Sequence, residues 1–145
     1  GDVVMLGETR FEVTATPGHT LGHVVFRAAA EDLAFVGDTL FPLGCGRLFE
    51  GTPEQMWDSL SRLLAWPDET VIWCAHEYTA ANARFALSVD DRPEMAARAT
   101  EIFAMRERGE ATIPTTVGAE KAFNPFLRAG DAASFATLRA AKDVF

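Results

Sequence analysis

Three side chains of the kinds that bind metal ions each stand just after a strand-like run of residues. His19 follows VTATPG, Asp38 follows LAFVG and His76 follows VIWCA. In open α/β sheets ligands bind at the carboxyl ends of strands, so we expect these side chains to converge within a few ångströms at adjacent strand ends. Imidazole nitrogens and carboxylate oxygens bind Zn²⁺ at about 2.0–2.2 Å, and a catalytic site keeps a further position for water. The pattern therefore suits a catalytic metal site.

Each of these residues also has an ordinary structural interpretation. A single histidine after a strand is more often a polar residue at the strand end than a ligand. An aspartate after a glycine is a common turn residue. The setting that His19, Asp38 and His76 share is what favours the metal site over these alternatives.

The residues that precede these side chains predict strands. Residues 11–15 alternate between apolar and polar types, residues 23–26 are rich in β-forming residues, and residues 33–36 form a short apolar run. Residues 70–74 form another run typical of a buried strand. Because each run ends at turn residues, we expect a sheet to present the candidate ligands.

Helices are predicted between and after the later strands. Thr52 is a predicted N-cap, followed by a proline and by the capping-box residue Gln55, and the helix that they begin should end before Pro67. Residues 78–89 are rich in alanine and helical in character. Strand and helix thus alternate over this part of the chain.

The last part of the chain has a different character. A long helical segment begins after Pro93 and reaches about Arg108, and no convincing strand follows. The sequence therefore predicts the α/β class, with residues 1–90 as an α/β unit and residues 91–145 as a helical C-terminal region. That region can either pack on the unit or stand partly apart from it.

Composition indicates an acidic, globular, soluble chain. The net charge of -8, from 21 acidic and 13 basic residues, repels phosphate and argues against nucleic acid as a partner. No apolar run approaches the roughly 20 residues needed to cross a membrane. Cys45 and Cys74 are too few for a disulfide framework, so we expect reduced, buried cysteines in a cytoplasmic protein. Targeting stays open because Gly1 is not a methionine.

Several segments, in their order and spacing, closely resemble the hydroxyacylglutathione hydrolases, or glyoxalase II, of the metallo-β-lactamase superfamily. The first, TPGHTLGH at 16–23, marks the superfamily, and the others narrow the resemblance to the family: GDTLF at 37–41, GCGR at 44–47, EGT at 50–52, HEYT at 76–79, NPFLR at 124–128 and LRAAKD at 138–143. The resemblance implies a metallo-β-lactamase-type αββα sandwich, of which this chain forms the C-terminal half, followed by a helical C-terminal region.

The resemblance also implies a site for two divalent metal ions, zinc first, with iron or manganese also compatible. His19 would bind one ion, His76 the other, and the catalytic residue Asp38 would bridge both, while His23 would be a supporting histidine. In the family a first-half motif T-H-x-H-x-D-H gives four further ligands, and this chain has no such motif. We therefore expect a fragment that needs the missing N-terminal half of the same protein and is weakly active or inactive alone.

The implied reaction is hydrolysis of S-2-hydroxyacylglutathione, typically S-lactoylglutathione, to glutathione and a 2-hydroxy acid such as D-lactate, in methylglyoxal detoxification. Metal coordination lowers the pKa of water from about 15.7 toward about 7, so hydroxide is available at neutral pH to attack the thioester. This chemistry needs no serine or cysteine nucleophile.

The small-molecule glutathione thioester carries carboxylates, and the positions that match the family's substrate-binding residues are Arg47, Phe49, Tyr78, Arg139 and Lys142. Arginine and lysine are suited to binding carboxylates. The basic residues would otherwise belong to a solvated face or complement the dipole of a last helical turn. Phe49 replaces a common tyrosine and Arg47 a common lysine. The i, i+3 spacing of Arg139 and Lys142 places both on one helix face.

Two other functions stay open. Two histidines and one carboxylate also make the ligand set of mononuclear iron oxygenases, and persulfide dioxygenases belong to the same superfamily. The C-terminal segment resembling the glutathione thioesterases argues against this alternative. The other is a non-catalytic binding or structural remnant, in which the motifs persist without metal.

Overall fold

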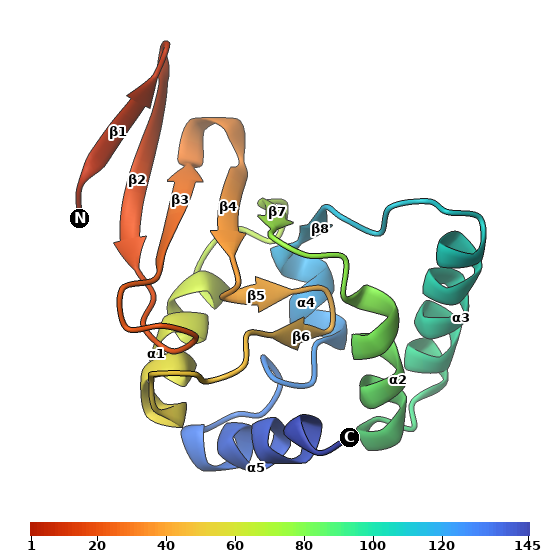
Figure 1. Ribbon diagram of the computed structural model, residues 1–145. Coiled ribbons are helices and arrows are strands. Elements are labelled where there is room, and N and C mark those ends of the chain that lie inside the picture. The colour runs from red at the N-terminus through yellow and green to blue at the C-terminus, as the bar shows by residue number, and fades with distance from the viewer.

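A six-stranded mixed sheet positions the candidate ligands. The computed structural model describes all of residues 1–145. The strands lie in the order β1, β2, β3, β4, β7 and β8, and in that order they span Val3–Leu6, Thr9–Ala15, Val24–Ala28, Leu33–Gly37, Val71–Cys74 and Thr115–Thr116. A short 3-10 helix, Ala29–Glu31, joins β3 to β4. Figure 1 shows the hairpin of β1 and β2 reaching beyond the other strands.

The strand directions bring three strand ends to one edge of the sheet. β2 pairs antiparallel with β3, and β3 pairs antiparallel with β4, so β2 and β4 run the same way. β4 pairs parallel with β7. The carboxyl ends of β2, β4 and β7 therefore share an edge, where side chains that follow different strands can meet.

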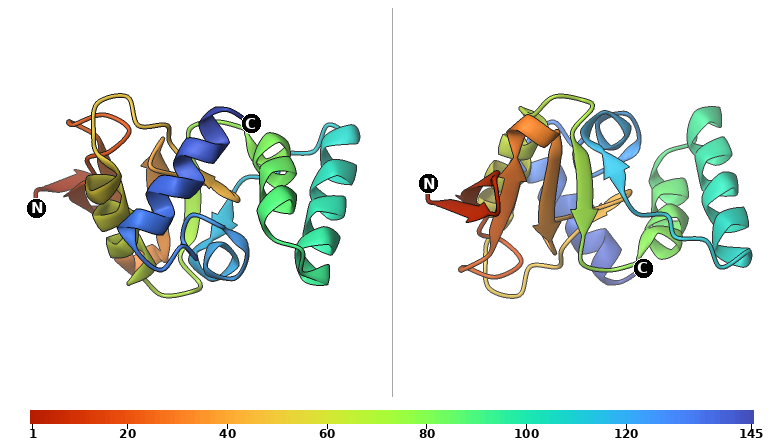
Figure 2. Two further views of the ribbon diagram at one scale, coloured as in Figure 1. Left: turned by 90° about the horizontal axis from the view of Figure 1, so that it is seen from below. Right: turned by 90° about the horizontal axis from the view of Figure 1, so that it is seen from above.

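One face of the sheet is buried beneath α1 (Pro53–Leu64), α4 (Val117–Phe123) and α5 (Ala132–Asp143), as Figure 2 shows. Because side chains alternate along a strand, Val25 and Ile72 point into this core and are fully buried. They belong to one cluster with apolar residues of the helices, among them Met56, Leu60, Leu63, Val117 and Phe135. Burial of this face holds the helices on the sheet.

The opposite face of the sheet carries large apolar side chains that are exposed. Val24, Phe26, Phe35 and Trp73 are between 36% and 46% exposed. In the pairing register Phe26 lies opposite Phe35, and Phe35 lies opposite Trp73, so these four residues form a continuous patch across β3, β4 and β7. We call it the apolar strip. A sheet face of this composition ordinarily packs against another layer.

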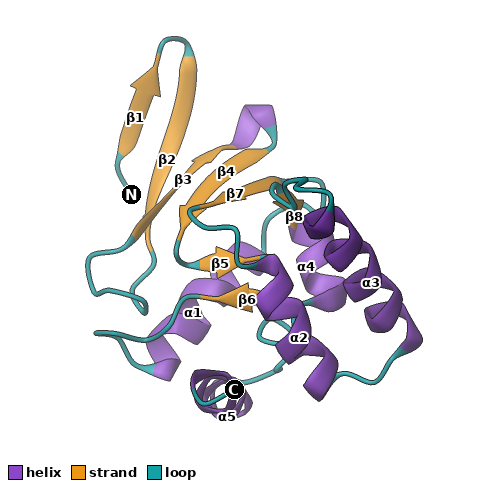
Figure 3. Ribbon diagram, turned by 45° about the vertical axis from the view of Figure 1, so that its right-hand side comes forward, coloured by secondary structure: helices purple, strands orange, loops and turns teal.

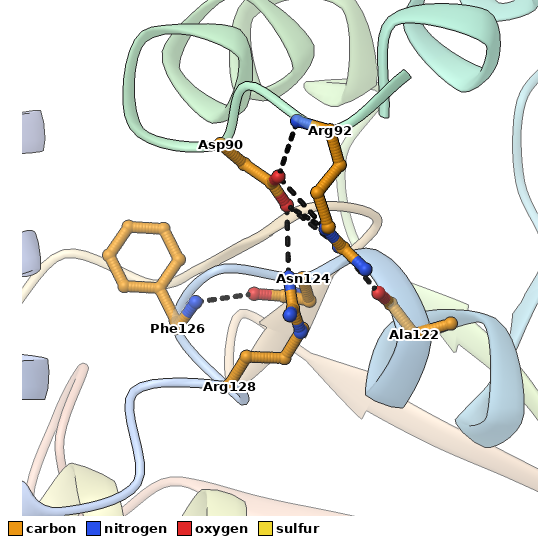
Figure 4. A network of polar contacts seen from close by, with 6 residues as sticks. All are labelled: Asp90, Arg92, Ala122, Asn124, Phe126 and Arg128. Atoms are coloured by element: carbon orange, nitrogen blue, oxygen red, sulfur yellow. Dashed lines mark hydrogen bonds and ion pairs between the residues drawn. The ribbon is translucent and has the colours of Figure 1, made fainter. Parts of the chain in front are cut away.

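The remaining helices, α2 (Thr79–Val89) and α3 (Pro93–Glu107), pack against each other beside the sheet (Figure 1). Asp90, between them, accepts hydrogen bonds from Arg92 Nη2 at 2.7 Å and from Arg128 Nη1 at 2.9 Å. Figure 4 shows these side chains converging, with Arg92 also donating to a carbonyl at the end of α4. This network fixes the α2–α3 corner to the turn that follows α4.

A second, two-stranded sheet consists of β5 (Leu40–Phe41) and β6 (Gly44–Cys45). Figure 3 shows this hairpin below the end of β4 and above α5. Both strands are buried, so the hairpin is part of the interior although it belongs to neither face of the main sheet.

Buried polar side chains of the α4 region hold this hairpin. The carboxyl group of Glu120 accepts hydrogen bonds from Leu43 N at 2.8 Å and from Thr115 Oγ1 at 2.7 Å. Asn124 Nδ2 donates to carbonyls on both strands and to Glu120. Both side chains are almost fully buried, and burial raises the pKa of Glu120 above its ordinary value.

Most of the predicted elements are confirmed. The four predicted strands form, and Thr52 makes the predicted capping box at the start of α1. The expectation that no strand follows Pro93 is wrong, since β8 pairs with β7, and β1 was not predicted. β8 has two residues, too few to show a periodicity, and it forms because β7 offers a free edge.

The C-terminal helical region packs on the α/β unit, since α4 and α5 belong to the same apolar cluster as the sheet. The division at residue 90 stays a prediction. None of the five α-helices combines the length and the apolar character needed to span a bilayer.

The Glu120 network predicts a contrast between two substitutions. Glu120→Ala leaves the buried donors of Leu43 and Thr115 without a partner and removes one of the acceptors of Asn124, so the free energy of unfolding should fall by about 3 kcal/mol. Glu120→Gln keeps an oxygen for two of these donors and an amide for the hydroxyl, so it should stay within about 1 kcal/mol of the parent. Urea unfolding at neutral pH measures both, and equal losses would contradict the network.

The Asp90 network predicts a dependence of stability on pH. Hydrogen bonds and charge from Arg92, with Arg128, hold the pKa of Asp90 at about 2, below its ordinary value of 3.8. The ionised carboxylate therefore stabilises the fold above pH 3.8, and this contribution is lost as the pH falls toward 2. Asp90→Asn should lower the free energy of unfolding by about 2 kcal/mol at neutral pH, and the difference should vanish near pH 2.

The matched control is Asp91→Asn, which changes the neighbouring exposed carboxylate. Urea unfolding of the three proteins between pH 2 and 7 is the measurement. A difference between Asp90→Asn and the parent that does not change with pH would show that the ionised carboxylate is not what stabilises the corner.

Candidate metal centre

The three candidate ligands converge at the shared edge of the sheet. His19 lies in the loop after β2, Asp38 directly follows β4, and His76 follows β7. His76 Nε2 is 3.2 Å from Asp38 Oδ1, and His19 Nε2 is 3.8 Å from Asp38 Oδ2. The predicted convergence is confirmed. The expectation that the three strands are neighbours is wrong for β2, because β3 lies between β2 and β4.

A backbone carbonyl orients His19. Its Nδ1 lies 2.7 Å from the carbonyl oxygen of Arg47, and a carbonyl only accepts, so Nδ1 carries the proton. The other ring nitrogen, Nε2, faces Asp38. A second partner that fixes the tautomer in this way is characteristic of histidines that bind metal.

His23 supports the backbone of Asp38, as predicted for a structural histidine. Asp38 N donates to His23 Nε2 at 3.1 Å, and the hydroxyls of Thr16 and Thr39 lie 3.2 and 3.0 Å from Nδ1. Burial lowers the pKa of His23, which keeps the ring neutral and Nε2 able to accept. Gly37 has a φ of 52° and leaves room for this ring, because a Cβ there would lie 2.8 Å from Nε2.

Aromatic side chains flank His76. The ring of Tyr78 stacks on the imidazole with centroids 4.8 Å apart and an interplanar angle of 17°. Phe41 lies edge-on to Tyr78 at 5.2 Å. Glu77, between His76 and Tyr78, accepts a hydrogen bond from Thr112 N at 3.1 Å. This bond holds the loop that carries His76 against the segment before β8.

Two hollows that share residues surround the candidate ligands. The first has a volume of about 380 Å³ and is lined by His19, Asp38, Phe41, Gly46, Arg47, Phe49, His76 and Tyr78. The second, of about 150 Å³, is lined by Phe41, Cys45, Arg47, Tyr78, Asn82, Arg139 and Lys142. All five predicted substrate contacts therefore line one hollow or the other. Phe41, Gly46 and Asn82 were not predicted, although the first two lie in the motifs at 37–41 and 44–47.

The three cations of these hollows are not equivalent. Lys142 makes no ion pair, and its Nζ lies 5.7 Å from the centre of the Phe85 ring. Burial, with the nearby guanidinium groups of Arg139 and Arg47, lowers the pKa of Lys142. Arg47 Nε is 3.4 Å from Asp143 Oδ1, and more than half of its side chain is exposed. Arg139 is only 6% exposed. Lys142 and Arg47 are thus the cations open to a ligand.

The cysteines beside the site are free, and burial raises the pKa of both Cys45 and Cys74 to about 11. Their thiols are therefore protonated at neutral pH, and a thiol is a far weaker nucleophile than a thiolate. This agrees with a reaction that needs no cysteine nucleophile.

The donor set suits divalent ions. Imidazole nitrogen and carboxylate oxygen are ordinary ligands of zinc and other first-row metals. No three or more His, Cys, Asp or Glu side chains enclose a single point closely enough to hold one ion by themselves. Instead, each carboxylate oxygen of Asp38 faces a different imidazole, so His19 and His76 lie on opposite sides of one carboxylate.

Sequence comparison assigns both parts of the chain to known families. The model for the metallo-beta-lactamase superfamily matches residues 1–76, and the model for the hydroxyacylglutathione hydrolase C-terminus matches residues 77–145. A protein of Maricaulis maris named hydroxyacylglutathione hydrolase is 60% identical over 139 residues, which are 95% of this chain and 54% of that protein. Another, of Erythrobacter litoralis, is 50% identical and is covered to 63%. The chain thus spans between about half and two thirds of the length of the curated relatives it matches.

Solved structures show the same fold. ETHE1 from Myxococcus xanthus has a TM-score of 0.68 at 29% identity, over 97% of this chain and 49% of that one. A metallo-beta-lactamase from Staphylococcus aureus has a TM-score of 0.62 at 20% identity, which shows the fold alone. The predicted fold class is confirmed, and the superfamily implies divalent metal binding. The chain belongs to the metallo-β-lactamase superfamily, and its residues 77–145 are similar to the C-terminus of the hydroxyacylglutathione hydrolases.

Proposed function

We propose that this chain is the metal-binding and substrate-binding part of a thioester hydrolase that converts S-2-hydroxyacylglutathione, typically S-lactoylglutathione, to glutathione and a 2-hydroxy acid such as D-lactate. This is a step of methylglyoxal detoxification. The observation that carries the proposal is the position of Asp38 between His19 and His76, at one end of a hollow that continues to Lys142. The named relatives support the choice of thioester.

His19, His76 and the catalytic residue Asp38 would hold the two divalent ions. Zinc is the proposed metal, and iron and manganese are also compatible with histidine and carboxylate ligands. When bound, such ions activate water for attack on the thioester carbonyl and offset the negative charge that develops there. The carbonyl of Arg47 keeps Nε2 of His19 free for its ion.

The substrate lies along the two hollows. Phe49, whose ring is 4.9 Å from that of His19, and Tyr78, stacked on His76, form apolar walls at the metal end. Arg47 and Lys142 bind the carboxylates of glutathione, and Arg139, the fifth predicted substrate-binding residue, lines the same hollow. Binding the distant carboxylates positions the thioester over the metal end.

The proposed partner is the first half of the same protein. The family resemblance implies that this half supplies the remaining metal ligands. The apolar strip supports this, because Val24, Phe26, Phe35 and Trp73 offer a face of the kind that a second sheet covers in a sandwich. We call the chain joined to this first half the longer form. The free cysteines are in keeping with a cytoplasmic location, which is part of the proposal.

A mononuclear iron enzyme of the persulfide dioxygenase kind is the second candidate. The structural likeness to ETHE1 favours it. The match of residues 77–145 to the hydroxyacylglutathione hydrolase C-terminus favours the thioesterase. The third candidate, a non-catalytic remnant, predicts neither activity.

The first test compares the chain with the longer form on S-lactoylglutathione at neutral pH with added Zn²⁺. Half a ligand set holds the ions poorly, so turnover by the chain alone should be at least about 100-fold slower, which corresponds to about 3 kcal/mol. Loss of the thioester absorbance measures turnover. Equal rates would show that the missing ligands are dispensable, and no hydrolysis by the longer form would overturn the proposed function.

The second test removes the free cation of the smaller hollow. In the longer form Lys142→Ala should raise KM for S-lactoylglutathione at least about tenfold, or about 1.4 kcal/mol, with the metal content unchanged. The matched control is Lys121→Ala, which removes a lysine paired with Asp68 on the surface and should leave KM unaltered. An unaltered KM for Lys142→Ala would show that this lysine belongs to a solvated helix face and does not bind the substrate.

A further inference from the structure

The two candidate histidine ligands are held in different ways. His19 donates from Nδ1 to the carbonyl of Arg47, so a hydrogen bond to the ring itself sets the orientation of this imidazole. The ring of His76 instead contacts side chains: Asp38 Oδ1 lies 3.2 Å from Nε2, and the ring of Tyr78 stacks on the imidazole. The position of His76 therefore depends on the backbone that carries it.

That backbone is the loop of residues 75–78 between β7 and α2, which we call the His76 loop. Ala75 N donates to the carbonyl of Gly37 at 3.0 Å, which ties the start of the loop to the end of β4. Farther along, the carboxylate of Glu77 accepts from both donors of Thr112, the backbone N–H at 3.1 Å and the hydroxyl. Hydrogen bonds to a carboxylate are stronger than those between neutral groups, and two of them hold Glu77 in one place.

Thr112 is well fixed and can serve as an anchor for this loop. It is only 6% exposed and lies in the connection of residues 108–114 between α3 and β8. Just beyond the connection, Thr115 pairs with Ile72 of β7 and donates from Oγ1 to the buried carboxyl group of Glu120. The connection is thus attached both to the sheet and to a buried polar network, so it can resist a displacement of the His76 loop.

Arg106, in the last turn of α3, lies beside the same carboxylate. Its Nε is 3.7 Å from Glu77 Oε1, and its Nη1 donates to the carbonyl of Glu110 at 2.6 Å. Roughly a third of each side chain of this ion pair is exposed, and pairs of this kind contribute little to stability. The hydrogen bonds from Thr112 are therefore the main attachment of Glu77.

We infer that Glu77 and Thr112 are positioning residues for the proposed metal ligand His76, because their hydrogen bonds attach the His76 loop to the connection between α3 and β8. The inference rests on the proposed metal site. Both residues lie within 77–145, the part of the chain that matches the hydroxyacylglutathione hydrolase C-terminus. The helical C-terminal region thus contributes to the metal centre as well as to the substrate hollow.

The test measures Zn²⁺ binding by the longer form, in competition with a chromogenic chelator. Glu77→Ala should lower the Zn²⁺ affinity about tenfold, as expected when a group that supports a metal-binding histidine is lost. Thr112→Val removes the hydroxyl donor but keeps the backbone N–H, so the affinity should fall in the same direction by a smaller factor. Thr112→Ser keeps both donors and should bind Zn²⁺ like the parent.

A double-mutant cycle shows whether Glu77 acts through His76. In a His76→Ala background, Glu77→Ala should cause no further loss of Zn²⁺ affinity, because the ligand that it positions is already absent. In a His19→Ala background, the same change should still lower the affinity about tenfold. A general structural role of Glu77 would lower the affinity equally in both backgrounds.

The matched control is Glu101→Ala, which removes a carboxylate that pairs with Arg98 on the surface of α3 and should leave Zn²⁺ affinity unaltered. Circular dichroism before metal addition confirms that each variant is folded. Thr112→Val in the same two backgrounds provides the comparison if Glu77→Ala does not fold.

The outcomes separate this inference from the proposed function. Parental Zn²⁺ affinity in the folded Glu77→Ala and Thr112→Val variants, or an equal loss in both histidine backgrounds, would overturn the inference. A parent protein that binds no Zn²⁺ would instead overturn the proposed function.

Discussion

The site depends on a buried carboxyl group and a buried amide, those of Glu120 and Asn124, between α4 and the β5–β6 hairpin. Burying such groups is unfavourable unless their hydrogen-bonding atoms are satisfied, so the network permits few positions of the hairpin. Apolar contacts alone tolerate sliding, whereas these bonds do not. The hairpin leads directly to Arg47, whose carbonyl orients His19. A polar network without any catalytic group therefore sets the geometry at the candidate ligands.

Charge is distributed unevenly over this acidic chain. The net charge is -8, yet Arg47, Arg139 and Lys142 gather around one hollow with Asp143 among them. The carboxylate of Asp143 offsets part of the repulsion between the guanidinium groups, so the cluster can form at the end of a helix. The rest of the acidic surface repels an anionic ligand, whereas the cations of this hollow attract it. Such a ligand therefore binds with its negative groups in the hollow.

How much the sequence predicts depends on how local the cause is. The capping box at Thr52 and the buried strand at 71–74 rest on neighbouring residues, so they could be predicted. The convergence of His19, Asp38 and His76 followed from the rule that ligands bind at strand ends. The order of the strands, with β3 between β2 and β4, and the pairing of β8 depend on contacts between distant residues and leave no local pattern. The contacts of Arg139 also depend on distant residues. Its spacing from Lys142 predicts that both lie on one helix face, but it does not predict that Arg139 binds the carbonyl of Cys45 and the carboxylate of Asp143.

The position of α5 beneath the β5–β6 hairpin has a consequence for synthesis of the protein. A ribosome makes the chain from its N-terminus, so His19, Asp38 and His76 emerge long before the last turn of α5. Until Arg139 and Asp143 have left the ribosome, nothing from α5 contacts Cys45 and Arg47, and the carbonyl of Arg47 is the one that orients His19. The ligands are thus present early, while their support arrives among the last residues, and an incompletely translated chain lacks that support.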